Sequence, residues 1–127
     1  MINRSVKIDI GGEERQLKFT LQALEELEAM LPNRNIFELM GRQTWAVNEI
    51  VSACFCGLKV YDYKLTRQTV EQWISNYVRD NEQGILKLNA YLIAAIGISG
   101  LVGGEKSAFE DVLKALEGDK EGVEAGK

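Results

Sequence analysis

The chain has no histidine, and this absence limits the chemistry that its 127 residues can perform. Histidine is the usual base beside a serine or cysteine nucleophile, and zinc sites commonly use it as a ligand. The G-x-S-x-G turn of serine hydrolases is missing too, and no lysine follows Gly11 and Gly12 at the spacing of a phosphate-binding loop. Glu25, Glu26 and Glu28 lie on the solvated face of a predicted helix. We therefore expect a protein that is not an enzyme and has no catalytic residue, metal site or cofactor.

Cysteine is scarce, since only Cys54 and Cys56 occur, in the run SACFCGL. Two positions apart on a helix, their thiols point about 200° away from each other, so they neither bridge nor easily share a metal ion. We predict that both are buried as small apolar side chains. Reduced cysteines fit an intracellular compartment, and we expect a cytoplasmic protein.

An excess of basic residues is also lacking, because 15 lysines and arginines stand against 19 acidic residues. Binding to a phosphate backbone needs a basic face, and none is visible. Two predicted helices within residues 45–78 are joined by KVYDYKLT, which is too long for a helix-turn-helix link. The most hydrophobic run, residues 90–104, is shorter than the roughly 20 residues that span a bilayer. We expect neither nucleic acid nor a membrane as a partner.

The N-terminal region has the pattern of a β-hairpin. Apolar and polar residues alternate in SVKIDI and again in RQLKFT, as in strands with one buried face. Between them, Gly11 and Gly12 supply the positive φ angles of a tight turn. A lone hairpin is marginally stable in water, so its apolar face must pack on helices. Thr20 then stands at the N-cap position of the first helix.

The remaining sequence predicts helices with apolar stripes. One helix begins at Asn35, another is capped by Thr66, and Asp80 with Gln83 is predicted to open a further helix that is apolar nearly all round from Ile85 to Ile98. The predicted stripes are Leu21, Leu24, Leu27 and Leu31; Val47, Ile50, Val51, Cys54, Phe55 and Leu58; Val70, Trp73, Ile74, Tyr77 and Val78; and Phe109, Val112, Leu113 and Leu116.

These elements predict an α+β fold in which an N-terminal β-hairpin packs on a bundle of about five or six helices. We expect residues 1–104 to form a single domain, residues 105–117 to form an amphipathic helix after a glycine hinge, and residues 118–127 to be a disordered tail.

Several aromatic and apolar residues are candidates for contact with a protein partner. Trp45 precedes a helix, and Tyr61 and Tyr63 lie in a loop, positions where aromatic residues often form interface cores. Trp73 and Tyr77 fit the core better. The helix at 107–117 could dock on its own domain or on another chain, and its own domain is favoured. The candidate partner-binding residues are Trp45, Tyr61, Tyr63, Phe109, Leu113 and Leu116.

The order of these elements resembles the phage tail assembly chaperones related to those of gene transfer agents. That family has a G-G-x-x-x-x-L-x-F-T hairpin, an N/Q-A-L-x-E-L-E helix, a small apolar helix ending in G-L, and a T-x-x-x-V helix start. The resemblance covers roughly residues 5–80. Here the motifs are Gly11, Gly12, Leu17, Phe19 and Thr20; Gln22, Ala23, Leu24, Glu26, Leu27 and Glu28; Gly57 and Leu58; and Thr66 and Val70.

The resemblance implies a small protein of the bacterial host cytoplasm that binds the tape measure protein during tail building and is absent from the finished tail. The tail tube protein is a further implied partner, and self-association stays open. Two other classes also stay open: a structural virion component, such as a head–tail connector or tail terminator, and a prophage regulator with weak nucleic-acid affinity.

Overall fold

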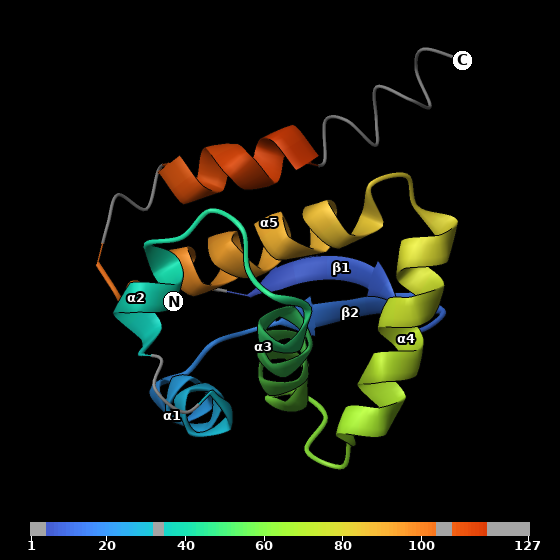
Figure 1. Cartoon of the computed structure of the whole chain (residues 1–127), viewed down its shortest axis with the longest axis horizontal. Coiled ribbons are helices and arrows are strands. Elements are labelled where there is room, and N and C mark those ends of the chain that lie inside the picture. The colour runs from blue at the N-terminus through green and yellow to red at the C-terminus, as the bar shows by residue number, and fades with distance from the viewer. Residues whose placement is uncertain (1–4, 32–34, 104–107, 117–127) are drawn as a thin grey trace.

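The computed structural model describes residues 5–31, 35–103 and 108–116. Within them, an antiparallel hairpin is followed by six helices, which confirms the predicted α+β fold (Figure 1). The last helix, residues 108–116, carries no label in the figure and follows α5. The labelled elements are β1 (Val6–Ile10), β2 (Glu13–Leu17), α1 (Leu21–Met30), α2 (Ile36–Met40), α3 (Val47–Lys59), α4 (Arg67–Asp80) and α5 (Gly84–Ile98).

The hairpin forms as the alternating pattern predicts. Ile10 pairs with Glu13 across a two-residue turn, and Val6 pairs with Leu17 at the far end. Gly11 and Gly12 have φ angles of 69° and 86°, which a two-residue hairpin turn requires and only glycine adopts freely. Alternate β1 residues are buried, so one face of the hairpin joins the core and the other faces outward.

Side-chain caps define where three helices begin. The hydroxyl of Thr20 accepts a hydrogen bond from the Ala23 amide at 3.1 Å, and Thr66 does the same for Thr69 at 3.2 Å. Asn35 caps α2 by accepting from the Glu38 amide at 2.8 Å. All three caps were predicted from the sequence. They satisfy amide groups that would otherwise lack partners at a helix start.

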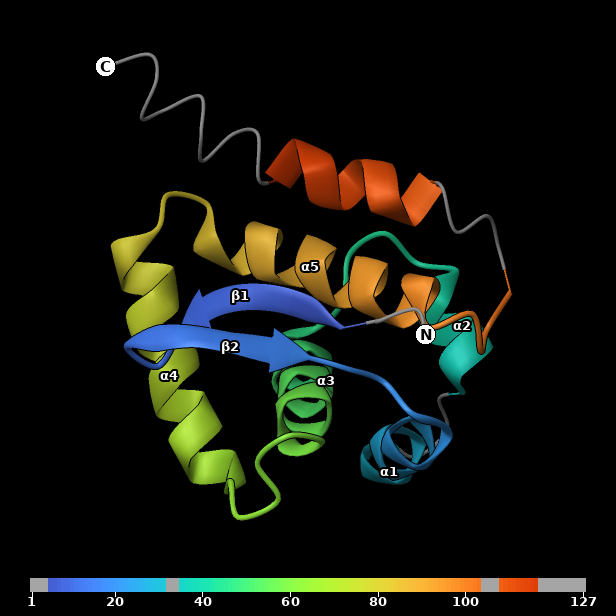
Figure 2. The same cartoon turned by 180° about the vertical axis from the view of Figure 1, so that it is seen from behind.

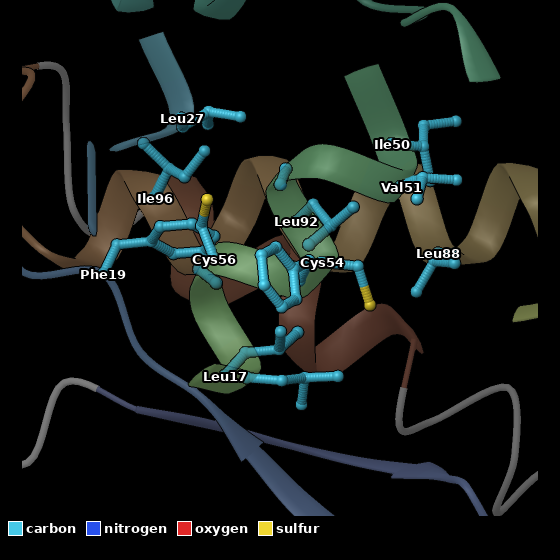
Figure 3. Packing of buried hydrophobic residues seen from close by; sticks show 14 of the residues in the cluster. Leu17, Phe19, Leu27, Ile50, Val51, Cys54, Cys56, Leu88, Leu92 and Ile96 are labelled. Carbon is cyan, nitrogen blue, oxygen red and sulfur yellow. The ribbon is translucent and has the colours of Figure 1, made fainter. Parts of the chain in front are cut away.

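The core forms around α3, which packs against α1, α4, α5 and β2. Figure 3 shows Leu17 from β2, Leu27 from α1 and Leu92 from α5 gathered about this helix. Cys54 and Cys56 are both buried there as free thiols, which confirms their predicted role as core side chains. Gly57 lets the hairpin approach, because a Cβ at this position would lie 2.8 Å from the Phe19 ring.

Four residues of the predicted apolar stripes are exposed: Leu21, Val47, Val78 and Val112. Leu21 and Val47 are the first residues of α1 and α3, so their side chains project beyond the neighbouring elements instead of between them. The predicted helix start at Asp80 is also wrong. Asp80 is the last residue of α4, and the chain reverses through Gln83, whose φ of 55° is left-handed, before α5 begins at Gly84.

The C-terminal amphipathic helix is present over residues 108–116, within the predicted range 105–117. Ser107 and Glu110 have the spacing of a capping box, which predicts a helix cap at Ser107. Ser107 and the predicted disordered tail at 118–127 lie outside the described residues. Across the parts of the chain that the structure describes, no helix combines the length and the apolar character needed to cross a bilayer.

Candidate protein-interaction surface

Tyr61 and Tyr63 are presented by the turn between α3 and α4. Their exposed fractions are 53% and 78%, whereas Tyr77 is buried and Tyr91 is partly buried. The turn is held by its own backbone, since the Tyr61 amide donates to the Leu58 carbonyl at 3.3 Å and the Leu65 amide donates to Asp62 at 3.0 Å. A backbone fixed in this way keeps both aromatic rings at the surface at a low entropic cost.

A hollow of about 320 Å³ lies between this turn, β2 and α4, and we call it the β2 groove. Its apolar side chains are Leu58, which is buried, and Leu65 and Trp73, which are partly buried. The full set of lining residues is Glu13, Glu14, Arg15, Gln16, Leu58, Tyr61, Asp62, Leu65 and Trp73. Three of these are acidic and one is basic, so the polar rim of the groove has a negative formal charge.

Trp73 lines both the β2 groove and a second hollow of about 640 Å³, and Glu13 also lines both. The Arg15 guanidinium stacks on the indole, with Cζ 3.9 Å from the ring centroid. Arg15 also donates to the carbonyls of Ile10 and Gly11, at 2.8 and 3.0 Å, so it ties the hairpin turn to α4. Gly11 also lies against the indole of Trp73, because a Cβ at position 11 would be 2.6 Å from that ring. These contacts together hold the indole in a fixed position.

The outer edge of β2 faces the same groove. In a two-residue hairpin, Ile10–Glu13 is a hydrogen-bonded pair, so the backbone groups of Glu14 and Gln16 point away from β1. The next residue in this alternation, Lys18, confirms the direction, since its amide donates to the Gly57 carbonyl of α3 at 3.1 Å. The edge beside the groove therefore offers backbone donors and acceptors to a segment lying there.

Phe109 and Leu113 lie elsewhere, on the helix of residues 108–116. Both side chains are partly buried and pack against the core cluster, while Leu116 is partly buried as well. A Cβ on Gly97 of α5 would lie 2.3 Å from the Phe109 ring, so this ring rests directly on the α5 backbone. This helix docks on its own domain, the alternative that the sequence favoured.

Trp45 is not at the surface, although the sequence made it a candidate for partner contact. It is 3% exposed, and its indole N–H donates to the Leu39 carbonyl at 3.0 Å. Its backbone amide donates to the Asn89 side chain at 2.9 Å, and the same Asn89 donates to the Gln43 carbonyl at 3.2 Å. Trp45 therefore belongs to the core, where Asn89 fixes the segment that leads into α3.

Burial shifts the pKa of three titratable side chains. Loss of water raises the pKa of Cys54 to about 12 and of Cys56 to about 11, and it raises the pKa of Tyr77 to about 12. Among residues 5–31, 35–103 and 108–116, no three cysteine, aspartate or glutamate side chains gather in a way that could hold a metal ion.

Comparison of the sequence with protein-family models and with curated proteins, and of the fold with solved structures, finds no match.

Proposed function

We propose that this chain is a tail assembly chaperone of a phage or prophage, a non-catalytic protein that binds the tape measure protein in the host cytoplasm during tail morphogenesis. The hairpin and helix motifs of residues 5–80 support the proposal through their resemblance to that family. A long tape measure protein exposes apolar helical surface before the tail tube encloses it. A partner that covers this surface keeps the protein in solution by mass action.

The β2 groove is the observation that carries the proposal. The exposed Tyr61 lines a hollow together with apolar Leu58, Leu65 and Trp73, and the exposed Tyr63 lies on the same turn as Tyr61. Aromatic side chains that are already ordered are the usual anchors of protein interfaces. The acidic rim, from Glu13, Glu14 and Asp62, adds selectivity because it favours a partner segment with basic residues next to its apolar ones.

Co-expression with a tape measure gene from the same genome tests the proposal. We expect the two proteins to elute together from a sizing column and the tape measure protein to move into the soluble fraction. The double variant Tyr61→Ala/Tyr63→Ala should weaken the complex by at least about tenfold, as loss of aromatic anchors does. Phe37→Ala is the matched control, because Phe37 on α2 is 65% exposed and does not line the groove.

The outcomes separate the function from the site. If the wild-type protein neither elutes with the tape measure protein nor raises its solubility, the chaperone proposal fails. If the tyrosine variant and the Phe37 control bind equally well, the function stands but the groove is the wrong surface. Detection of the protein in purified particles would indicate a structural virion component, and a salt-dependent shift of DNA would indicate a regulator. A gene position between those for the tail tube and the tape measure protein would support the proposal independently.

A further inference from the structure

Helix α5 has apolar residues around its whole circumference and therefore needs cover on more than one side. Leu88, Leu92 and Ile96 are fully buried against the core. A second stripe, which we call the α5 stripe, consists of Leu86, Ala90, Ile93 and Gly97, at the helical spacing of four, three and four residues. In both views the helix of residues 108–116 runs alongside α5 in the opposite direction (Figures 1 and 2). Its first aromatic residue, Phe109, rests on Gly97.

Gly97 forms a notch that admits a large side chain from the covering helix. The three atoms nearest to a Cβ built at this position all belong to the Phe109 ring, at 2.3 to 2.4 Å. Real Cβ atoms do not approach other atoms this closely, so the ring fills the space that any other residue at 97 would occupy. The notch therefore selects a covering helix that carries a bulky apolar residue at this point.

The helix of residues 108–116 is short, and it covers α5 incompletely. Phe109, Leu113 and Leu116 are only partly buried, and Val112 on the same helix is 40% exposed. With nine residues, the helix is shorter than the about 12–15 residues that an isolated helix needs to be even marginally stable, so docking is what keeps it folded. Gly100 and Gly103, with φ angles of 78° and 81°, make the turn that leads away from α5. Such a helix has few contacts to lose when it leaves.

We propose that the α5 stripe is a binding site for an amphipathic helix of another protein, and that residues 108–116 occupy it until that helix displaces them. The resident helix defines what the site accepts: a bulky apolar residue for the Gly97 notch, followed by leucines four and seven positions later, as in Phe109, Leu113 and Leu116. This inference stands apart from the chaperone proposal, because it rests on α5 and not on the β2 groove.

The test uses the full chain and a defined probe, a fluorescein-labelled peptide with the sequence of residues 105–118. Phe109→Ala in the full chain weakens the resident helix and leaves the notch open, so it should bind the peptide about tenfold more tightly than the wild-type chain. Adding Gly97→Ala to this variant should return binding to the wild-type level or below, because the new Cβ fills the notch. Val112→Ala is the matched control on the same helix and should bind as the wild type does.

Two further measurements keep the outcome clear. The peptide with its own Phe109→Ala change should not bind any of the chains. Hydrogen exchange of the single variant Gly97→Ala should show lost protection in residues 108–116 and unchanged protection in α3, which separates undocking from unfolding. Equal or absent binding by the wild type and the Phe109 variant would overturn the proposal, as would full binding after closure of the notch. A wild-type dimer that forms with rising concentration and is lost in Gly97→Ala would also overturn it, because a second copy would then be the occupant.

Discussion

Replacement of Asn89 by leucine should destabilise the fold although leucine has a similar size and suits an apolar helix. Asn89 is buried on α5, where its side chain accepts a hydrogen bond from the Trp45 amide at 2.9 Å and donates one to the Gln43 carbonyl at 3.2 Å. Leucine leaves the Trp45 amide without a partner in a buried site, which costs about 1–3 kcal/mol. Gln43 is exposed, so its carbonyl recovers a water molecule. Added apolar burial offsets about 1 kcal/mol of the loss at most.

With the cost of the unpaired amide in the middle of its range, the expected net loss is about 1 kcal/mol in the free energy of unfolding, seen as a fall of about 0.5–1 M in the urea midpoint with an unchanged slope. Circular dichroism at 222 nm follows the transition. Hydrogen exchange adds a local readout, because protection of the Trp45 amide should fall more than that of amides in α3. Gln68→Leu at an exposed position of α4 is the control and should change stability by less than about 0.5 kcal/mol. If both leucine variants unfold at the same urea concentration, the reasoning about Asn89 is refuted.

Gly57→Ala should destabilise the fold by about 1–3 kcal/mol in urea titrations, because its Cβ would overlap the Phe19 ring in the core. Gly41→Ala is the control: its Cβ meets no atom closer than 3.4 Å, so it should cost far less. Equal losses of stability in the two variants would contradict the packing described at Gly57. Burial raises the pKa of Cys54 to about 12 and of Cys56 to about 11, so between pH 9 and 11 the unfolded chain releases protons that the folded chain keeps. Stability should therefore fall with rising pH in that window, by about 1.4 kcal/mol per pH unit for each thiol. Alanine variants of the two cysteines should lose this slope between pH 9 and 10, whereas above pH 10 a slope from Tyr77, whose pKa is raised to about 12, should remain. Thr20→Ala should cost about 1 kcal/mol of thermal stability through the lost cap, and an unchanged melting temperature would count against the cap.

Local patterns predicted the elements well, because their causes lie within a few residues. The hairpin turn at Gly11 and Gly12 and the helix caps at Thr20 and Thr66 depend on short-range geometry. The exposed Val47 shows where this reasoning ends. The spacing of apolar residues gives the face of a helix, but only the neighbouring elements decide how far along the helix that face is covered.

The candidate surface could be predicted only in part. Tyr61 and Tyr63 are exposed on a turn, as the sequence predicts, whereas Trp45 is buried and hydrogen-bonds both to the nearby Leu39 and to Asn89, which is 44 positions away in the chain. No sequence signal indicated that Arg15 would stack on Trp73, since that contact requires the hairpin tip to reach α4. A lone polar residue in an apolar helix, such as Asn89, was a signal that could have pointed to a buried hydrogen-bonding role.

The position of Trp73 makes it an intrinsic fluorescent probe of this protein. One indole, that of Trp45, is enclosed and hydrogen-bonded, while the other is partly open and stands against a guanidinium at the mouth of two hollows. The two fluorophores therefore have different surroundings and should differ in emission wavelength and in access to a quencher such as iodide. Occupation of the β2 groove would change the fluorescence of Trp73 and leave that of Trp45 as an internal standard, so binding can be followed without an attached dye.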